Sequence, residues 1–164
     1  MITSDDHWGK AQRFIAREAL YLDARDWDAW LDLYHESAEY LVPAWDDDGE
    51  LTTDPQREIS LIYYANRGGL EDRVFRIRTK RSSATMPAMR TCHQFTLLDV
   101  KPTDQGLTVR TNWSTHSFRE SGSTHYFGWA YYDLAVHGND FKIMRKKTVV
   151  LNDVAETMMD VYSI

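Results

Sequence analysis

Four residues spread along the chain have side chains suited to acid–base chemistry: Tyr40, His93, His116 and Asp133. A histidine or aspartate tuned by its surroundings can take up or release a proton, and a tyrosine hydroxyl can stabilise a developing oxyanion. Gathered in one cavity, these groups would suit an isomerase or a dehydratase. Buried tyrosine and histidine more often satisfy hydrogen bonds within a core, so a ligand-binding or purely structural domain stays open as an alternative.

Metal and cofactor chemistry has little support in the sequence. A Rieske cluster needs two cysteines and two histidines, whereas Cys92 is the single cysteine of this chain. The six histidines are scattered, and the closest helical pairing of a histidine with a carboxylate is His35 with Glu39. The segment Arg67-Gly-Gly-Leu70 lacks the lysine and the spacing of a phosphate-binding loop. We therefore expect neither a metal nor a cofactor on this chain.

Three helices are predicted in the first half of the chain. Ser4 can cap a first helix that starts at Asp5, and its apolar face is marked by Trp8, Ala11, Ile15, Ala19 and Leu22. Asp26 can cap a second, shorter helix, whose apolar positions are Trp27, Trp30, Leu31 and Tyr34. A third helix is expected from about Arg67 to Lys80, with an apolar seam formed by Leu70, Val74 and Ile77.

The strands are concentrated in the second half. A strand over Glu39–Trp45 that is ended by proline is followed by an exposed acidic loop at 46–55, and a short strand lies at 62–64. From Arg90 onward we expect four long strands in an antiparallel meander, separated by turns at 102–106, 120–123 and 137–140. Phe118 falls on the opposite parity to Leu107 and Val109, which predicts a bulge between Ser114 and Ser117.

Helices followed by a curved antiparallel sheet define an α+β architecture, with the helices packed on one concave face. This order matches the cone-shaped fold shared by ketosteroid isomerase, scytalone dehydratase and nuclear transport factor two. A chain of 164 residues suits one domain, 1–164, with a substantial core. Fold alone does not choose among the functions that this architecture supports.

Composition narrows the classes of partner. The formal net charge of −6 argues against a nucleic-acid partner, and no apolar run approaches the roughly 20 residues of a membrane helix. The N-terminal residues lack the basic and apolar stretches of an export signal, so we expect a cytoplasmic protein. Aromatic residues make up 13% of the chain and include six tryptophans, which suggests a heavy core that continues into an interface.

Four cations are candidates for such an interface. Arg73 and Arg76 lie on the basic outer surface of the third predicted helix. On the last strand, odd-numbered positions from Phe141 to Leu151 are apolar except at Arg145 and Lys147, which predicts that these two cations interrupt an apolar face and meet a partner's carboxylate. A solvated charged face is the simpler interpretation of both runs.

Several segments together resemble the β (small) subunit of aromatic-ring-hydroxylating dioxygenases. The resemblance spans most of the chain and is carried, in the family's order, by Asp26-Trp-Asp-Ala-Trp-Leu-Asp-Leu-Tyr34, Tyr40-Leu-Val-Pro43, Ile62-Tyr-Tyr64, Leu70-Glu-Asp-Arg-Val74 and Arg90-Thr-Cys-His93. The C-terminal part, Lys146-Lys-Thr-Val-Val-Leu-Asn-Asp153 and Met159-Asp-Val-Tyr-Ser-Ile164, is most similar to the benzoate, toluate and anthranilate branch.

The resemblance implies a structural role without catalytic residues on this chain. In that family a large α subunit holds a Rieske 2Fe-2S cluster and a mononuclear Fe(II), and the β subunit packs with it in a hexamer of three α and three β chains. The assembled enzyme takes electrons that originate from NADH and adds both atoms of dioxygen to an aromatic ring. The aromatic substrate and the α-contacting residues are not readable from this chain, because the substrate pocket is expected in the α subunit.

Overall fold

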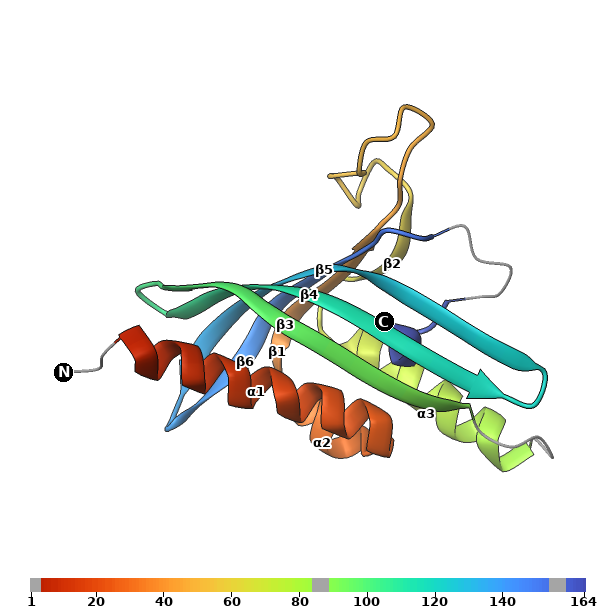
Figure 1. The fold of residues 1–164 in the computed structure, drawn as a ribbon, viewed down its shortest axis with the longest axis horizontal. Coiled ribbons are helices and arrows are strands. Elements are labelled where there is room, and N and C mark those ends of the chain that lie inside the picture. Colours follow the sequence, from red (N-terminus) through yellow and green to blue (C-terminus); the bar gives the residue numbers. More distant parts are fainter. Residues whose placement is uncertain (1–3, 84–88, 154–158) are drawn as a thin grey trace.

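One mixed sheet with helices on one of its faces forms the protein (Figure 1). The computed structural model describes residues 4–83, 89–153 and 159–164. The elements in chain order are α1 (Ser4–Ala24), α2 (Trp27–Asp32), β1 (Tyr34–Pro43), β2 (Ser60–Tyr64), α3 (Arg67–Ser83), β3 (Arg90–Pro102), β4 (Gly106–Arg119), β5 (Gly122–His137), β6 (Asp140–Val150) and the 3₁₀ turn η1 (Val161–Ser163). The predicted α+β order of helices and strands is therefore confirmed.

The sheet has the order β2-β1-β6-β5-β4-β3. Strands β3 to β6 form the predicted antiparallel meander, β1 pairs antiparallel with β2, and β1 pairs parallel with β6. That parallel pairing places β1, the strand that follows α2, between β2 and the last strand, β6. The helices cover the face that we call inner, and the opposite face is the outer one. No helix in the described part of the chain is long and apolar enough to cross a membrane.

Helix α1 packs mainly against β3, through a face rotated from the predicted one. Ala11, Ile15 and Leu22 are buried as expected, but Trp8 is 43% exposed, and Phe14 and Glu18 are buried as well. These positions still follow helical spacing. The predicted start of the helix agrees with the structure, but the side chain of Ser4 lies outside the described residues, so its capping role stays a prediction.

Helix α2 is shorter than its apolar spacing predicted. The Asp26 side chain caps it as expected by accepting a hydrogen bond from the Ala29 backbone N–H at 3.2 Å. Tyr34 is not helical, however, and begins β1 five residues before the predicted start at Glu39. The Ile143 backbone N–H donates to the Leu33 carbonyl at 2.8 Å, and Tyr34 pairs with Ile143 in the parallel ladder. Pairing with β6 therefore overrides the local helical pattern.

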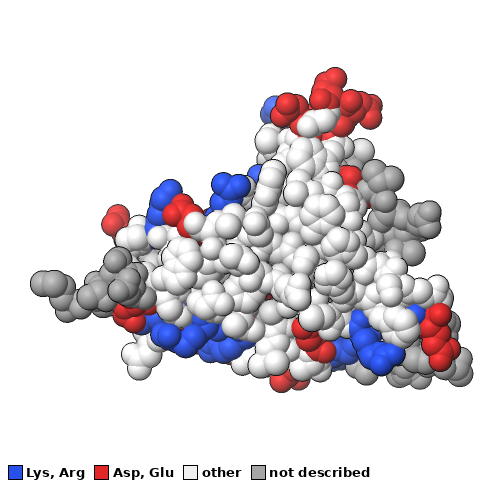
Figure 2. Space-filling model, in the orientation of Figure 1, with Lys and Arg blue, Asp and Glu red and all other residues white. Residues whose placement is uncertain are grey.

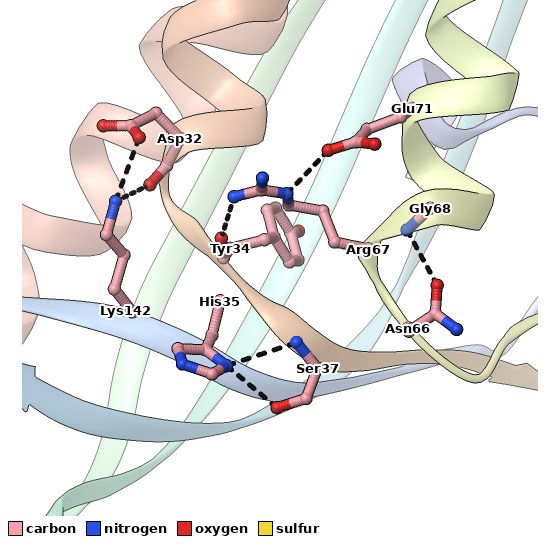
Figure 3. Close-up of polar contacts among 9 residues, drawn as sticks. All are labelled: Asp32, Tyr34, His35, Ser37, Asn66, Arg67, Gly68, Glu71 and Lys142. Carbon is pink, nitrogen blue, oxygen red and sulfur yellow. Dashed lines mark hydrogen bonds and ion pairs between the residues drawn. The ribbon is translucent and has the colours of Figure 1, made fainter.

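Helix α3 begins at Arg67, as predicted (Figure 3). Hydrogen bonds made by the residue before the helix and by its first residue stabilise the first turn. The Asn66 side chain accepts a hydrogen bond from the Gly68 N–H at 2.9 Å, and the Arg67 guanidinium donates to the Tyr34 carbonyl at 3.0 Å and to Glu71 at 2.8 Å. A Cβ atom at Gly69 would lie 2.4 Å from the Tyr64 ring. The glycine pair thus permits close approach of α3 to β2. The helix continues to Ser83, three residues beyond its predicted end at about Lys80.

The predicted bulge between Ser114 and Ser117 is wrong. Strand β4 keeps an uninterrupted register with β5 throughout that segment. Phe118 has the opposite parity simply because it faces outward, with 44% of its surface exposed. The register shifts instead at Leu98 of β3 and at Met144 of β6, each of which is skipped in its ladder. An extra residue of this kind reverses the faces of all residues beyond it.

The bulge at Met144 corrects the predicted placement of the two cations on β6. Ile143 faces the core with no exposed surface, and after the extra residue it is Lys146, 4% exposed, that faces inward. Arg145 and Lys147 pair with Asp133 and Tyr131 and share their outward orientation. The odd-numbered residues of β6 therefore do not all lie on the same face of the sheet.

The segment between β1 and β2 projects from the body of the protein, and acidic side chains gather at its tip (Figures 1 and 2). The tip is internally braced, since one oxygen of the Asp46 carboxylate accepts hydrogen bonds from the backbone N–H groups of Asp48 and Glu50, both at 2.9 Å. Asp46 to Glu50 are exposed, which confirms the predicted acidic loop.

Candidate functional site

A buried ion pair joins the first helix to the last strand in the interior of the cone. Glu18 of α1 is 2% exposed, and its carboxylate lies 3.0 Å from the Lys146 ammonium of β6. The same carboxylate accepts hydrogen bonds from the hydroxyls of Tyr34 at 2.6 Å and Tyr132 at 2.8 Å. The Lys146 ammonium also lies over the rings of Tyr40 and Tyr132, at 5.8 and 5.3 Å from their centres. We call Glu18, Tyr34, Tyr132 and Lys146 the interior cluster.

The electrostatics of the interior cluster favour a charged Glu18. Burial alone would raise the pKa of its carboxyl group, but the positive charge of Lys146 and the three hydrogen bonds outweigh burial, so the pKa falls below its ordinary value. Burial, and then the negative charge of Glu18, raise the pKa of the Tyr34 and Tyr132 hydroxyls well above 10.0. Both tyrosines therefore remain neutral donors to the carboxylate.

A second pair, Asp23 of α1 and His93 of β3, lies at the same interface. One carboxylate oxygen of Asp23 is 2.6 Å from His93 Nδ1, and the other accepts from the His93 backbone N–H at 3.1 Å. The Thr91 hydroxyl donates to the same carboxylate at 3.0 Å. Burial alone would raise the pKa of Asp23. The hydrogen bonds from His93 and Thr91 and the nearby imidazole outweigh burial, so the pKa lies below its ordinary value. An ionised carboxylate can only accept, so the imidazole Nδ1 donates the hydrogen bond to Asp23.

A cavity of about 30 Å³ lies between the two pairs, lined by polar groups that include Glu18, His93, Thr115, Tyr132, Lys146 and Thr148. Pockets that bind organic ligands usually measure about 300 Å³ or more. This interior space therefore has the functional groups of an acid–base site but only the volume of one or two water molecules.

The structure separates the four residues predicted for acid–base chemistry. Tyr40 is fully buried near Lys146, and His93 lines the interior cavity. His116 and Asp133 are exposed on the outer face, where the His116 ring stacks on His125 with their centres 4.7 Å apart. The alternative isomerase or dehydratase site thus lacks two of its four groups in the interior.

Sequence reasoning missed Glu18, Asp23 and Lys146. Glu18 lies four residues after Phe14 and seven after Ala11, both buried, so helical spacing alone could have placed it on the inner face. The inward orientation of Lys146 depends on the bulge at Met144, for which the sequence carries no evident signal.

The four interface cations have different surroundings. Arg73 forms a two-pronged ion pair with Asp160, and Arg145 is 2.7 Å from Glu39. The carboxylate expected from a partner beside Arg145 is therefore supplied by the neighbouring strand. Lys147 lies over the Tyr131 ring at 5.8 Å, and Arg76 is exposed on α3.

No described helix covers the outer face of β4 and β5 (Figure 1). This face is rich in aromatic side chains. Phe127 is 39% exposed, and Trp129 and Tyr131 are half-buried. The Arg110 guanidinium lies 5.7 and 5.5 Å from the ring centres of Trp129 and Tyr131. Together with Phe118, we call these residues the outer aromatic face. A surface of this composition is typical of protein interfaces.

Metal ligation has no geometric basis in the part of the chain that the structure describes, since no group of three His, Cys, Asp or Glu side chains is arranged to hold an ion. His35 and Glu39, the pairing noted in the sequence, lie on β1 and not on a helix. The His35 Nδ1 atom instead contacts the Ser37 hydroxyl at 2.8 Å (Figure 3).

Comparison with known proteins places this geometry in a family. Residues 17–157 match the family described as "Ring hydroxylating beta subunit". The β subunit of benzoate 1,2-dioxygenase from Acinetobacter baylyi is 48% identical over 153 residues, which cover 93% of this chain and 90% of that protein. The β subunit of toluate 1,2-dioxygenase from Pseudomonas putida is 45% identical over 152 residues, or 92% of this chain and 94% of that one.

Solved structures support the same family and fold. The crystal structure of the benzoate 1,2-dioxygenase β subunit from Burkholderia mallei matches with a TM-score of 0.83 and 42% identity, over 100% of this chain and 99% of that chain. An NTF2-like protein with a cystatin-like fold from Novosphingobium aromaticivorans matches with a TM-score of 0.62 and 13% identity, over 92% and 85% of the two chains, and supports the fold alone. The cone fold and the resemblance read from the sequence are both confirmed: the chain belongs to the family of ring-hydroxylating dioxygenase β subunits.

Proposed function

We propose that this chain is the structural β subunit of a dioxygenase that acts on benzoate or a similar aromatic acid, in aromatic catabolism in the cytoplasm. The observation that carries the proposal is the 48% identity to a benzoate 1,2-dioxygenase β subunit over nearly the full length of both proteins. In this assignment the complex adds both atoms of dioxygen to the aromatic ring, and this chain contributes no catalytic residue.

The partner is an α subunit that carries the Rieske 2Fe-2S cluster and the mononuclear Fe(II), with NADH as the ultimate electron donor. A hexamer of three α and three β chains is the expected assembly. The single cysteine of this chain supports a division of labour in which the iron–sulfur chemistry belongs to the other subunit. The small interior cavity supports it as well, because an aromatic substrate would not fit there.

The outer aromatic face is the surface that we expect the α subunit to cover. It combines exposed Phe127 and Phe118 with the half-buried Trp129 and Tyr131 and with Arg110. Aromatic residues and arginine are enriched at the centres of protein interfaces. Among the cations predicted from the sequence, Lys147 borders this face through Tyr131, and Arg145 lies next to it on β6. Arg73 and Arg76 lie on α3 and would belong to a separate contact.

Co-expression tests the proposal. The tagged chain is produced together with the α subunit encoded in the same source and is purified through the tag. We expect a brown complex that contains a larger iron-bearing chain and that consumes benzoate when NADH and a reductase are supplied. A colourless homo-oligomer that leaves the α subunit behind would contradict the proposal and favour a stand-alone isomerase, dehydratase or ligand-binding protein.

A further inference from the structure

We propose that the cavity between α1 and the sheet is a binding site for one or two water molecules, which serve as hydrogen-bond partners for buried polar groups beside the Asp23–His93 pair and the interior cluster. The inference concerns the interior of this chain and does not depend on whether an α subunit binds to it.

Three buried polar atoms of residues that line the cavity indicate that water occupies it. His93 Nε2, Thr115 Oγ1 and Thr148 Oγ1 are buried and have no hydrogen-bond partner among the described residues. Thr115 and Thr148 are 0% and 1% exposed, and the His93 side chain is 9% exposed. Buried polar groups in folded proteins nearly always have a partner, and water supplies it where protein atoms do not.

The sheet register places two of these three groups directly beside each other. His93 of β3 lies directly opposite Thr115 of β4, and directly opposed side chains have Cβ atoms about 4.5–5.5 Å apart. Thr148 and Lys146 are alternate residues of β6, both facing inward. The sheet side of the cavity therefore carries the imidazole and one hydroxyl on β3 and β4, and the second hydroxyl and the ammonium group on β6.

The volume and polarity of the cavity argue against an organic ligand and against an empty cavity. A buried water needs about 10–15 Å³ of this kind of space and two to four polar partners, and the cavity offers about 30 Å³. An organic ligand would not fit, and cavities that stay empty have apolar walls, whereas the wall here combines apolar side chains with those of Glu18, His93, Lys146 and two threonines.

A crystal structure of the full chain at atomic resolution tests the proposal directly. We expect one or two ordered waters within hydrogen-bond distance of His93 Nε2, Thr115 Oγ1 and Thr148 Oγ1. A cavity without ordered density would overturn the proposal, and so would a rearrangement that pairs the three atoms directly with protein groups.

A cavity-filling variant gives a second test, in which a gain in stability is the result that contradicts bound water. Ala19 of α1 lines the cavity, and Ala16 is exposed on the same helix. If water is bound, Ala19→Met displaces it and leaves polar atoms unpaired, so the folding equilibrium constant should fall by about tenfold or more relative to Ala16→Met. An increase in stability with Ala19→Met would show that the cavity is dry and would overturn the proposal.

Discussion

Glu18 and Lys146 are 128 residues apart in the chain, yet their charged groups lie 3.0 Å apart in the interior. Their contact connects the first helix to the last strand of the sheet. Tyr34, at the start of β1, donates to the same carboxylate, so one buried group holds three distant segments in register. A polar contact of this kind specifies which residue of α1 faces the sheet and which face of β6 points inward.

Removing one partner of this pair should be far more harmful than removing both. We expect Glu18→Leu or Lys146→Met to lower the free energy of unfolding by about 3–5 kcal/mol, because each leaves a buried charge without its partner. The double variant Glu18→Leu with Lys146→Met should recover most of that loss. Urea unfolding of all four proteins measures the coupling between the two residues. Additive losses in the double variant would show that the pair does not act as a unit.

Acid should destabilise the protein through Glu18 and Asp23. The folded-state pKa of each is lowered from ordinary values of 4.5 and 3.8, so the stabilisation that they provide is fully present above those values and is lost as the pH falls through the lower folded-state pKa. Urea midpoints measured from pH 6 downward should therefore decline at acid pH. The double variant Glu18→Leu with Lys146→Met should decline less steeply; an identical slope would exclude Glu18 as a source of the acid sensitivity.

Two tryptophans should respond differently to truncation. Trp30 is fully buried and packs edge-on against Trp27 and Tyr34, with ring centres 6.0 and 5.1 Å away. Trp30→Ala should lower the free energy of unfolding by about 3–5 kcal/mol. Trp129 is half-buried on the outer aromatic face, so Trp129→Ala should cost the isolated chain less and weaken assembly with the α subunit more. Chemical unfolding and co-purification separate the two effects, and normal assembly of both variants would contradict this division.

A charge on the outer aromatic face should block assembly without unfolding the chain. Phe127→Glu places a carboxylate at a site that is 39% exposed, where the isolated chain can solvate it but an interface cannot. The matched control is Phe75→Glu, which changes a phenylalanine that is 68% exposed on α3. Only Phe127→Glu should reduce the amount of α subunit recovered with the tagged chain. The reverse result would assign the interface to the helical side.

The sequence predicted the layers of the fold better than the ends of its elements. The four long strands followed from turn residues and alternation, and α2 and α3 began where Asp26 and Arg67 indicated. Tyr34 was misassigned because its strand conformation depends on Ile143, more than a hundred residues later. Local spacing carries no information about such a partner.

The interior site was less predictable for the same reason. His93 was selected correctly as an interior group, but its partner Asp23 and the Glu18–Lys146 pair emerge only when α1 packs on the sheet. The single extra residue at Met144 decides which cation on β6 faces inward. A strict alternation therefore selected Arg145 and Lys147 and passed over Lys146.

Omission and reconstitution test whether the chain is an essential structural subunit of a dioxygenase. The α subunit is purified alone and then mixed with this chain, and native mass spectrometry and benzoate consumption with NADH and a reductase are recorded before and after mixing. We predict that the α subunit alone is unassembled and inactive, and that mixing yields a complex of three α and three β chains with activity. Full assembly and activity of the α subunit without this chain would contradict the account.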